Sequence, residues 1–186
     1  MALIDLSKQV ALGIDIGGTN TKYGLVNHRG EILEKGNIKT DDYPEVEDFI
    51  DALFNTINPL IIKHCEEKQF EGIGVGAPNA NYFRGTIEQA PNLSWKGVVP
   101  FAELMTKKFG VPCKMTNDAN AAALGEMMFG AARGMKDFIM ITLGTGVGSG
   151  IISNGSLIYG HDGFAGELGH CKIDHSGAGR MCGCGQ

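Results

Sequence analysis

Short runs of apolar residues mark the first elements of the chain. Residues 10–16 predict a buried strand, and residues 21–26 and 31–38 predict two more, with a turn at 27–30 between them. We therefore expect the chain to open with a β-meander whose first turn is rich in glycine.

A longer stretch, residues 44–65, carries apolar side chains at every third or fourth position. This spacing is typical of a helix with one buried face. Pro59 lies inside the stretch and has no amide hydrogen, so we expect it to kink the helix or to split it in two.

Strand and helix patterns alternate over the next part of the chain. Residues 70–77 predict a strand, 78–91 a loop or hairpin, 101–109 a short helix and 111–116 another strand. The alternation favours an α/β architecture.

An alanine-rich helix is expected to follow directly. Thr116 or Asn117 can cap it, because the side-chain oxygen of either residue can accept a hydrogen bond from the first turn. Asp118 would then stand at the N-terminus of this helix.

The pattern of strand, glycine-rich turn and strand occurs a second time. Residues 138–143 predict a buried strand that runs into a glycine-rich turn at 144–150. The two units lie about 130 residues apart, which indicates two related halves. We expect an N-terminal α/β domain at 1–117 and the start of a second α/β domain at 118–186.

Composition narrows the class of protein. The 186 residues are 43% apolar and 20% charged, which excludes disordered and fibrous chains. The formal net charge of −5 argues against nucleic acid as a partner. Glycine, with 28 residues, is about twice as frequent as usual and clusters between apolar runs, which indicates backbone shaped around a ligand.

No apolar run approaches the roughly 20 residues of a membrane span, and the polar start does not resemble a signal peptide. We therefore predict a cytoplasmic protein with no membrane partner. The five cysteines are an odd number, so a disulfide framework is not expected. Cys65 and Cys113 fall at predicted core positions, whereas Trp95 is either a core anchor or a pocket wall.

The first glycine-rich turn has the residue types of a phosphate cradle. Because it joins two strands, the N–H groups of Gly17 and Gly18 can converge on an anion, with Thr19 and Asn20 as side-chain donors. Asp15 suits Mg²⁺ bound through water, since this ion prefers one or two carboxylates together with phosphate oxygens. The alternative is an ordinary turn in which Asp15 accepts the turn's own amides.

The second glycine-rich turn contains Gly144, Thr145 and Gly146 and repeats this pattern. A phosphoryl group in transfer needs donors from two sides, which a cleft between two domains supplies. The alternative is a glycine-rich hairpin at a crowded packing site.

Polar residues of two further kinds lie outside the glycine turns. Asp118 can accept the proton of a hydroxyl that attacks phosphorus, or it can simply cap its helix. Glu167 and His170 are three residues apart and can hydrogen-bond neighbouring hydroxyls, or they can be solvated surface.

Three residues near the end of the sequence, His170, Cys182 and Cys184, are candidate ligands of a structural Zn²⁺ ion. Such sites are four-coordinate, and Cys171 or His175 can complete the set. The alternative is a pair of free thiols.

Six motifs occur in a fixed order: Asp15-x-Gly-Gly-Thr19-Asn20, Ala90-Pro91-Asn92-Leu93, Asn117-Asp118-Ala119-Asn120, Leu143-Gly-Thr145-Gly, Glu167-Leu-Gly-His170 and Cys182-Gly-Cys184-Gly. Together they resemble the ROK family of repressors, open reading frames and kinases, with its bacterial glucokinase branch most similar. The resemblance extends from about residue 10 to the last residue.

This resemblance implies the actin-like ATPase fold, also called ribonuclease-H-like, in which two α/β domains close on a sugar and MgATP. The activity that it implies is transfer of the ATP γ-phosphoryl group to the 6-hydroxyl of a hexose. Glucose is the first choice of substrate, and N-acylmannosamine or another hexose is the alternative. It also implies a homo-oligomer, either a dimer or a tetramer.

The resemblance also assigns roles to individual residues. Asp118 matches the general base. The sugar-binding positions of the family match Asn92, Asn117, Glu167 and His170. Its cofactor-binding positions match Asp15, Gly17, Gly18, Thr19, Asn20, Lys22, Gly144, Thr145 and Gly146. His170, Cys182 and Cys184 match zinc ligands that brace the sugar pocket.

The sequence departs from the family pattern after Cys184, where a further cysteine and a sugar-binding glutamate would follow. We therefore expect an incomplete second domain, weak ATP binding and little or no turnover. A sugar-responsive regulator of the same family is an alternative, although the first strand begins within about ten residues of Met1 and leaves no room for a helix-turn-helix segment. A non-catalytic zinc-binding module is a third class.

Overall fold

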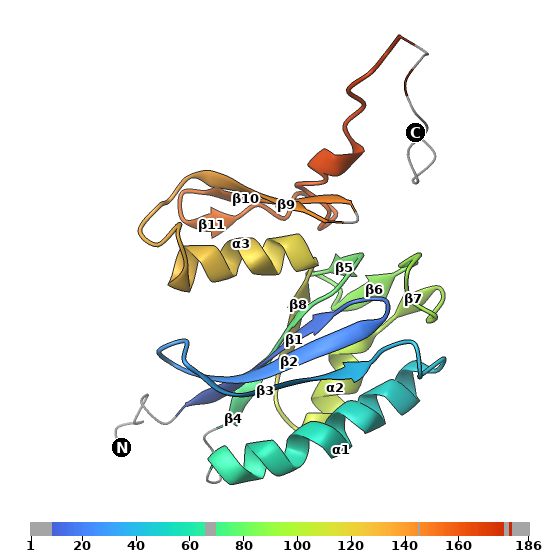
Figure 1. The fold of residues 1–186 in the computed structure, drawn as a ribbon, viewed down its shortest axis with the longest axis vertical. Coiled ribbons are helices and arrows are strands. Elements are labelled where there is room, and N and C mark those ends of the chain that lie inside the picture. Colours follow the sequence, from blue (N-terminus) through green and yellow to red (C-terminus); the bar gives the residue numbers. More distant parts are fainter. Residues whose placement is uncertain (1–8, 66–69, 145, 177–178, 180–186) are drawn as a thin grey trace.

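The computed structural model describes residues 9–65, 70–144, 146–176 and 179. Its larger sheet has five strands in the order β3-β2-β1-β4-β8 (Figure 1). Strands β1 (Val10–Ile16), β2 (Asn20–Asn27) and β3 (Ile32–Lys39) form the predicted antiparallel meander. Strand β4 (Phe70–Gly76) pairs with β1 in parallel, and β8 (Cys113–Thr116) pairs with β4 in parallel.

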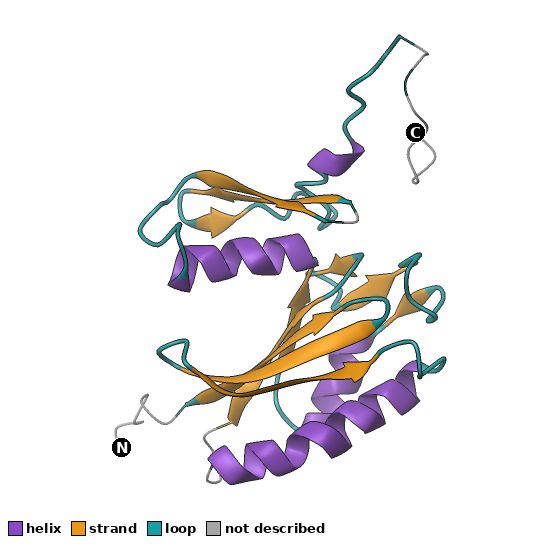
Figure 2. Cartoon of the chain, in the orientation of Figure 1, coloured by secondary structure: helices purple, strands orange, loops and turns teal. Residues whose placement is uncertain are grey.

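One face of this sheet carries the main core. Alternate strand residues such as Leu12, Ile14 and Val75 are buried there against α1 (Val46–His64) and α2 (Phe101–Phe109). Figures 1 and 2 show both helices on this face and α3 (Asp118–Phe129) on the opposite side. The residues between the buried ones, among them Gly13 and Gly74, therefore lie on the face that turns away from α1 and α2.

Of the two outcomes expected at Pro59, the split is wrong, because α1 runs as one helix through this residue, whereas the kink stays a prediction. A proline at this position removes the hydrogen bond to the carbonyl of Asn55. Both residues are exposed, so water can take the place of the missing donor. The cost of the proline is therefore small enough for the buried face of α1 to outweigh it.

The segment predicted as a loop or hairpin is a hairpin. Strands β5 (Ala80–Asn81) and β6 (Thr86–Glu88) pair antiparallel, and β7 (Val98–Val99) adds a third short strand. Trp95, on the loop before β7, proves to be a core anchor. It is buried against Phe49 at a ring-centroid distance of 4.7 Å, and its indole N–H donates to the carbonyl of Tyr43 at 3.2 Å.

The second sheet has three strands in the order β11-β10-β9. Strand β9 (Phe138–Leu143) pairs with β10 (Val147–Ser153), which pairs with β11 (Ser156–Leu157). This sheet packs on α3, and the short 3₁₀ helix η2 (Leu168–His170) lies beside β10. Two sheets on either side of α3 are compatible with two related halves, while the limits 1–117 and 118–186 stay a prediction.

Two cysteines lie in the first core, as predicted. Cys113 is buried, and Cys65 is partly buried against the same cluster. Burial raises the pKa of the Cys113 thiol to about 12, which keeps it protonated at neutral pH. In the described parts of the chain, no helix has the length and apolarity needed to cross a bilayer.

Candidate active site at the carboxyl edge of the larger sheet

The carboxyl ends of β1, β4 and β8 meet at one edge, which we call the carboxyl edge. The strand register aligns Asp15 with Gly76, and Gly76 with Thr116. A Cβ atom placed on Gly76 would lie 3.5 Å from the Cα atom of Asp118. The fold thus brings Asp15 and Asp118, which are about 100 residues apart in sequence, to the same edge, where α/β sheets bind ligands.

The first glycine turn is compact and leaves the Asp15 carboxylate free. The Gly17 amide donates to the Asn20 carbonyl at 3.1 Å, and the Thr40 amide donates to the Thr19 carbonyl at 2.9 Å. Asp15 is exposed, and within the described residues it accepts no hydrogen bond from the turn. The carboxylate therefore remains available to a ligand rather than closing the turn.

The loop that carries Asn92 lies directly on this turn. A Cβ atom on Gly18 would stand 2.6 Å from the Asn92 carbonyl oxygen and 3.4 Å from its Cβ atom. Only glycine permits this approach without a shift of the backbone. The close packing places a predicted sugar-binding residue next to a predicted phosphate turn.

Asn117, and not Thr116, caps α3. Its Oδ1 atom accepts the Ala119 amide at 2.9 Å, and Oδ1 of Asp118 accepts the same amide at 2.8 Å. Asp118 is exposed, and its second oxygen accepts no hydrogen bond within the described residues. The carboxylate thus supports the helix terminus and still presents one oxygen to a ligand.

The second glycine turn is held near the first turn of α3. The Gly144 amide donates to the Gly146 carbonyl at 2.9 Å, while Thr145 lies outside the described residues. A Cβ atom on Gly148 would be 3.0 Å from that of Ala119, and one on Gly150 would be 2.6 Å from that of Ala123. The absence of side chains at Gly148 and Gly150 therefore lets β10 lie close to the helix that begins at Asp118.

A buried serine that the sequence analysis missed fixes the loop of Glu167 and His170. Ser149 is 5% exposed, its hydroxyl donates to the Gly166 carbonyl, and it accepts the Leu168 amide at 3.3 Å. The only sequence signal for this role was its place inside the second glycine motif.

The predicted pair of Glu167 and His170 projects from this loop. Glu167 Oε2 and His170 Nε2 are 3.8 Å apart, and their side chains are 45% and 60% exposed. Both side chains are therefore accessible to a polar ligand.

The predicted zinc ligands are only partly described. His170 is exposed, and so are Cys171 and His175, whereas Cys182 and Cys184 lie outside the described residues. Within the described residues, no three His, Cys, Asp or Glu side chains are grouped as a metal site would need. The zinc site thus stays a prediction from the resemblance.

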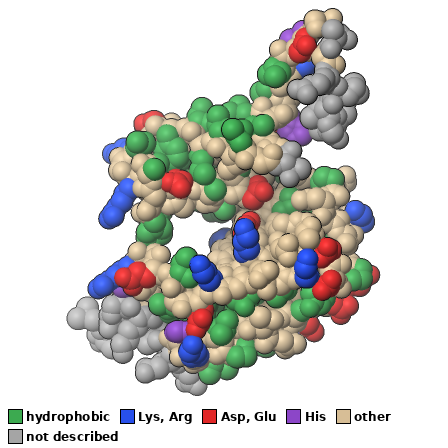
Figure 3. All heavy atoms as spheres, viewed as in Figure 1, with side chains coloured by type: hydrophobic (Ala, Val, Ile, Leu, Met, Phe, Trp, Pro, Cys, Tyr) green, Lys and Arg blue, Asp and Glu red, His purple; other side chains and the backbone are tan. Residues whose placement is uncertain are grey.

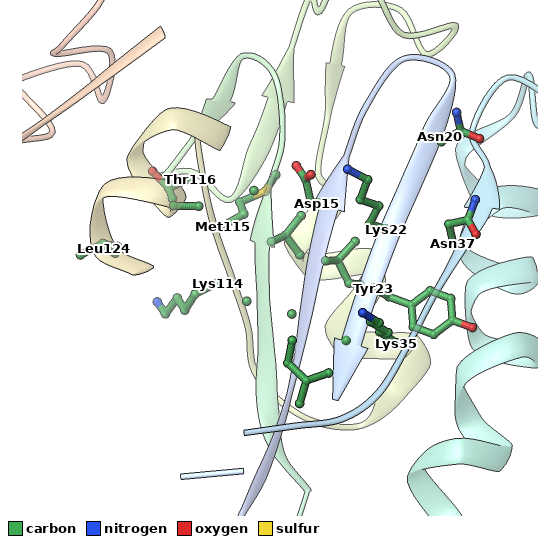
Figure 4. A pocket seen from close by; sticks show the side chains of 18 of the residues that line it. Asp15, Asn20, Lys22, Tyr23, Lys35, Asn37, Lys114, Met115, Thr116 and Leu124 are labelled. Carbon is green, nitrogen blue, oxygen red and sulfur yellow. The ribbon is translucent and has the colours of Figure 1, made fainter. Parts of the chain in front are cut away.

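A cavity of about 1040 Å³ covers the open face of the larger sheet. Figure 4 shows Asp15 and Lys22 side by side on neighbouring strands, and Lys35 and Lys114 also line the cavity. Figure 3 shows the molecule hollowed between the two sheets, with charged side chains at the margin. An exposed carboxylate at Asp15, with Asp118 nearby, is a donor set that fits Mg²⁺ carrying phosphate oxygens.

Comparison with known proteins agrees with this geometry. The chain matches the ROK family over residues 11–186. It is 38% identical to a glucokinase of Streptomyces coelicolor over 95% of this chain and 53% of that protein. It is 36% identical to a xylose repressor of Caldicellulosiruptor bescii over 98% of this chain and 46% of that protein.

A solved structure shows the same arrangement of elements. A ROK glucokinase from Streptomyces griseus, in complex with glucose and AMPPNP, superposes with a TM-score of 0.77 at 38% identity, covering 95% of this chain and 54% of that one. The fold is thus the actin-like ATPase fold of ROK sugar kinases. The chain spans about half the length of the curated relatives it matches.

The family match covers all six motifs, and the fold agrees with that of a solved member at the same level of sequence identity. This chain belongs to the ROK family.

Proposed function

We propose that the carboxyl edge of this chain forms part of the active site of an ATP-dependent hexose kinase. Such a kinase phosphorylates the 6-hydroxyl of the sugar, and glucose is our first choice of substrate. The observation that carries the proposal is the meeting of Asp15 and Asp118 at the carboxyl edge, with a glycine turn on either side. The similarity to glucokinases, one of them solved with glucose and AMPPNP, supports the choice of donor and substrate.

In this proposal, Asp118 is the general base. The oxygen of Asp118 that is not bonded to the Ala119 amide accepts the proton of the 6-hydroxyl while the hydroxyl oxygen forms a bond to the γ-phosphorus. The bond from that phosphorus to the bridging oxygen breaks, and ADP leaves with its electron pair. The position of the Asp118 carboxylate beside the attacking hydroxyl is what matters most here, because catalysis of phosphoryl transfer depends mainly on positioning and charge neutralisation.

The other residues bind and orient. Amide groups of the two glycine turns, together with Lys22, would neutralise the phosphate oxygens. Asp15 would hold Mg²⁺ through water, and this ion supplies further charge neutralisation when bound. The sugar hydroxyls would be hydrogen-bonded by Asn92, Asn117, Glu167 and His170.

The test separates binding from transfer. We expect Asp118→Asn to leave the hexose Kd within about threefold while lowering phosphoryl transfer by at least about 100-fold, since only the proton acceptor is lost. The exposed Asp48 offers the matched control, because Asp48→Asn makes the same change in the first turn of α1, on the opposite face of the larger sheet from α3. Hexose binding is measured by titration calorimetry.

Phosphoryl transfer from MgATP is measured with glucose, mannose and N-acetylmannosamine in turn. The assay compares this chain with a chain lengthened to the size of its ROK relatives. Transfer that survives Asp118→Asn would overturn the role of Asp118. Sugar binding without transfer by the lengthened chain would favour a sugar-responsive regulator, the second candidate, which the 36% identity to a xylose repressor supports.

Three further features belong to this proposal. They are a structural zinc at His170, Cys182 and Cys184, a homo-oligomeric assembly, and a cytoplasmic location. Each follows from the family resemblance.

A further inference from the structure

We propose that Asn81 is a positioning residue that aligns the loop of Glu167 and His170 with the first half of the chain. Asn81 lies at the end of β5 and is 1% exposed. It belongs to none of the family motifs in the sequence. Its importance for sugar binding rests on the proposed function, whereas its structural link does not.

The Asn81 side chain divides its hydrogen bonds between two parts of the chain. Its Oδ1 atom accepts the amides of Phe83 at 3.1 Å and Arg84 at 3.2 Å, which shapes the β5–β6 hairpin. Its Nδ2 atom donates to the Asp162 carbonyl at 2.9 Å, 81 residues further along the chain. The two donors around Oδ1 define the orientation of the amide, because the reverse orientation would oppose N–H to N–H.

The backbone after Asp162 is shaped to receive this side chain. Gly163 is buried and has φ of +87°, a left-handed conformation that favours glycine. A Cβ atom on Gly163 would lie 3.1 Å from Oδ1 of Asn81 and 3.3 Å from its Nδ2. The loop therefore passes so close to Asn81 that a side chain at position 163 would force one of the two to shift.

Two further contacts hold the same loop: a ring contact of Tyr159 with Tyr82 of the hairpin, and a hydrogen bond of Gly166 with Ser149 of β10. The rings of Tyr82 and Tyr159 stack at a centroid distance of 4.1 Å and an interplanar angle of 14°. The Ala165 amide donates to the Tyr159 carbonyl at 2.9 Å, which closes the turn between these contacts. Since Ser149 holds Gly166, the position of Glu167 is defined from both halves of the molecule.

The consequence is a specific role for one buried amide. Asn81 fixes the loop at Asp162 relative to the β5–β6 hairpin. The sugar-binding candidates Glu167 and His170 follow a few residues later in the same loop. A positioning group of this kind acts on ligand affinity through geometry and not through contact with the ligand.

Asn81→Asp tests this role with little change in shape. The remaining carboxylate oxygen still accepts the amides of Phe83 and Arg84, whereas the donor to Asp162 becomes an acceptor that faces a carbonyl oxygen. Asn79→Asp is the matched control on the same hairpin, because Asn79 donates to the Glu88 carbonyl at 3.0 Å and, among the residues that the structure describes, forms no hydrogen bond with the loop.

Hydrogen exchange without any ligand provides the first readout. In Asn81→Asp we expect the amides of Ala165, Leu168 and His170 to exchange at least about tenfold faster, with the amides of β1 and β4 unchanged. Asn79→Asp should leave the amides of the loop at their original rates. Unchanged exchange in the loop of Asn81→Asp would overturn the proposal.

Hexose affinity, measured by calorimetry with glucose, provides the second readout. We expect Asn81→Asp to raise the glucose Kd about tenfold and Asn79→Asp to leave it unchanged. Faster loop exchange with an unchanged Kd would refute the effect on the sugar site. If the unaltered chain binds no hexose, the proposed function fails, while hydrogen exchange still decides the link itself.

A second substitution covers the case in which Asn81→Asp does not fold. Gly163→Ala introduces strain at φ of +87° and a methyl group against Asn81 from the other side. We expect the same local increase in exchange from this change. A folded Gly163→Ala variant with an unaltered loop would contradict the proposal.

Discussion

At the scale of single residues, close approach of the backbone explains why several site positions are glycine. Gly18 is pressed against the Asn92 carbonyl, Gly150 against Ala123, and Gly169 against the Val147 carbonyl. At none of these three positions is the backbone left-handed. Glycine is needed at these three positions because a Cβ atom would collide with a neighbour. At Gly163 and Gly166, in contrast, the φ angle is positive.

Gly18→Ala should therefore damage both stability and ligand binding. The added methyl group would stand 2.6 Å from the Asn92 carbonyl oxygen, so the turn or the loop must move. We expect a loss of about 1–3 kcal/mol in the free energy of unfolding, measured with urea, together with a weaker hexose Kd.

Gly125→Ala is the control of opposite sign. Gly125 lies inside α3, with no heavy atom within 4 Å of the added methyl group. Alanine there should stabilise the chain by up to about 1 kcal/mol. A Gly18→Ala variant as stable as Gly125→Ala would show that the contact with Asn92 is not tight.

At the scale of elements, hydrophobic periodicity identified most helices and strands. The free-energy cost of placing Pro59 inside a helix was overestimated. Helix α1 spans Pro59 because its apolar stripe, which includes Leu53, Ile57 and Ile61, is buried along its whole length. The ends of elements depend on polar contacts that periodicity does not reveal. The cap of α3 is one of these, since both Thr116 and Asn117 were plausible.

An ion-pair cluster joins β3 to α1 and makes this contact sensitive to acid. Glu34 accepts hydrogen bonds from Lys63 at 2.6 Å and from His64 at 3.0 Å. The hydrogen bond from Lys63, followed by that from His64, lowers the pKa of Glu34 from its ordinary value of 4.5. Ionisation of the Glu34 carboxyl group is therefore more favourable in the folded chain than in the unfolded chain.

The stabilisation from Glu34 should be complete above pH 4.5 and should be lost as the pH falls through its lower folded-state pKa. We expect Glu34→Gln to flatten this part of the pH dependence of the urea midpoint. Glu71→Gln, at an exposed position on β4, should retain the original slope. Equal slopes in Glu34→Gln and the unaltered chain would exclude a role for this cluster.

At the scale of the whole molecule, two sheets are linked through α3 and through the hairpin that contacts the 159–165 loop. The stacked pair of Tyr82 and Tyr159 bridges the halves. Burial, followed by the neighbouring Tyr82, raises the pKa of Tyr159, as expected for a phenol shielded from water. This contact provides a direct measure of how strongly the halves are coupled.

A double-mutant cycle can measure that coupling. We expect Tyr82→Leu and Tyr159→Leu to be non-additive by about 0.5–1.5 kcal/mol in the free energy of unfolding, since stacked rings add to simple burial. Tyr43 packs on Phe49 in the first core and serves as the control, so Tyr43→Leu and Tyr159→Leu should be additive. Additivity of the Tyr82 and Tyr159 changes would contradict a stabilising stack.

The sequence by itself determined the family, most of the helices and longer strands in their order, and the two glycine turns. These properties depend on local patterns, namely alternation in strands, a helical stripe in 46–64 and motif residues next to one another. The positions of Cys113 in the core and of Asp118 at a helix start followed from the same patterns. A one-dimensional pattern is sufficient wherever neighbours in sequence define the environment.

Only the tertiary structure decided which distant residues meet. Parallel pairing of β1, β4 and β8 brings Asp15 to the edge where Asp118 lies, and no local pattern encodes that register. Asn81 belongs to no motif, and Ser149 lies inside the second glycine motif with no role that the motif assigns. Both became significant through their partners, Asp162 and Gly166, which lie 81 and 17 residues further along the chain. The physical reason is that a buried polar group must find its partner in space, and the packing of the two sheets determines which distant group lies within reach.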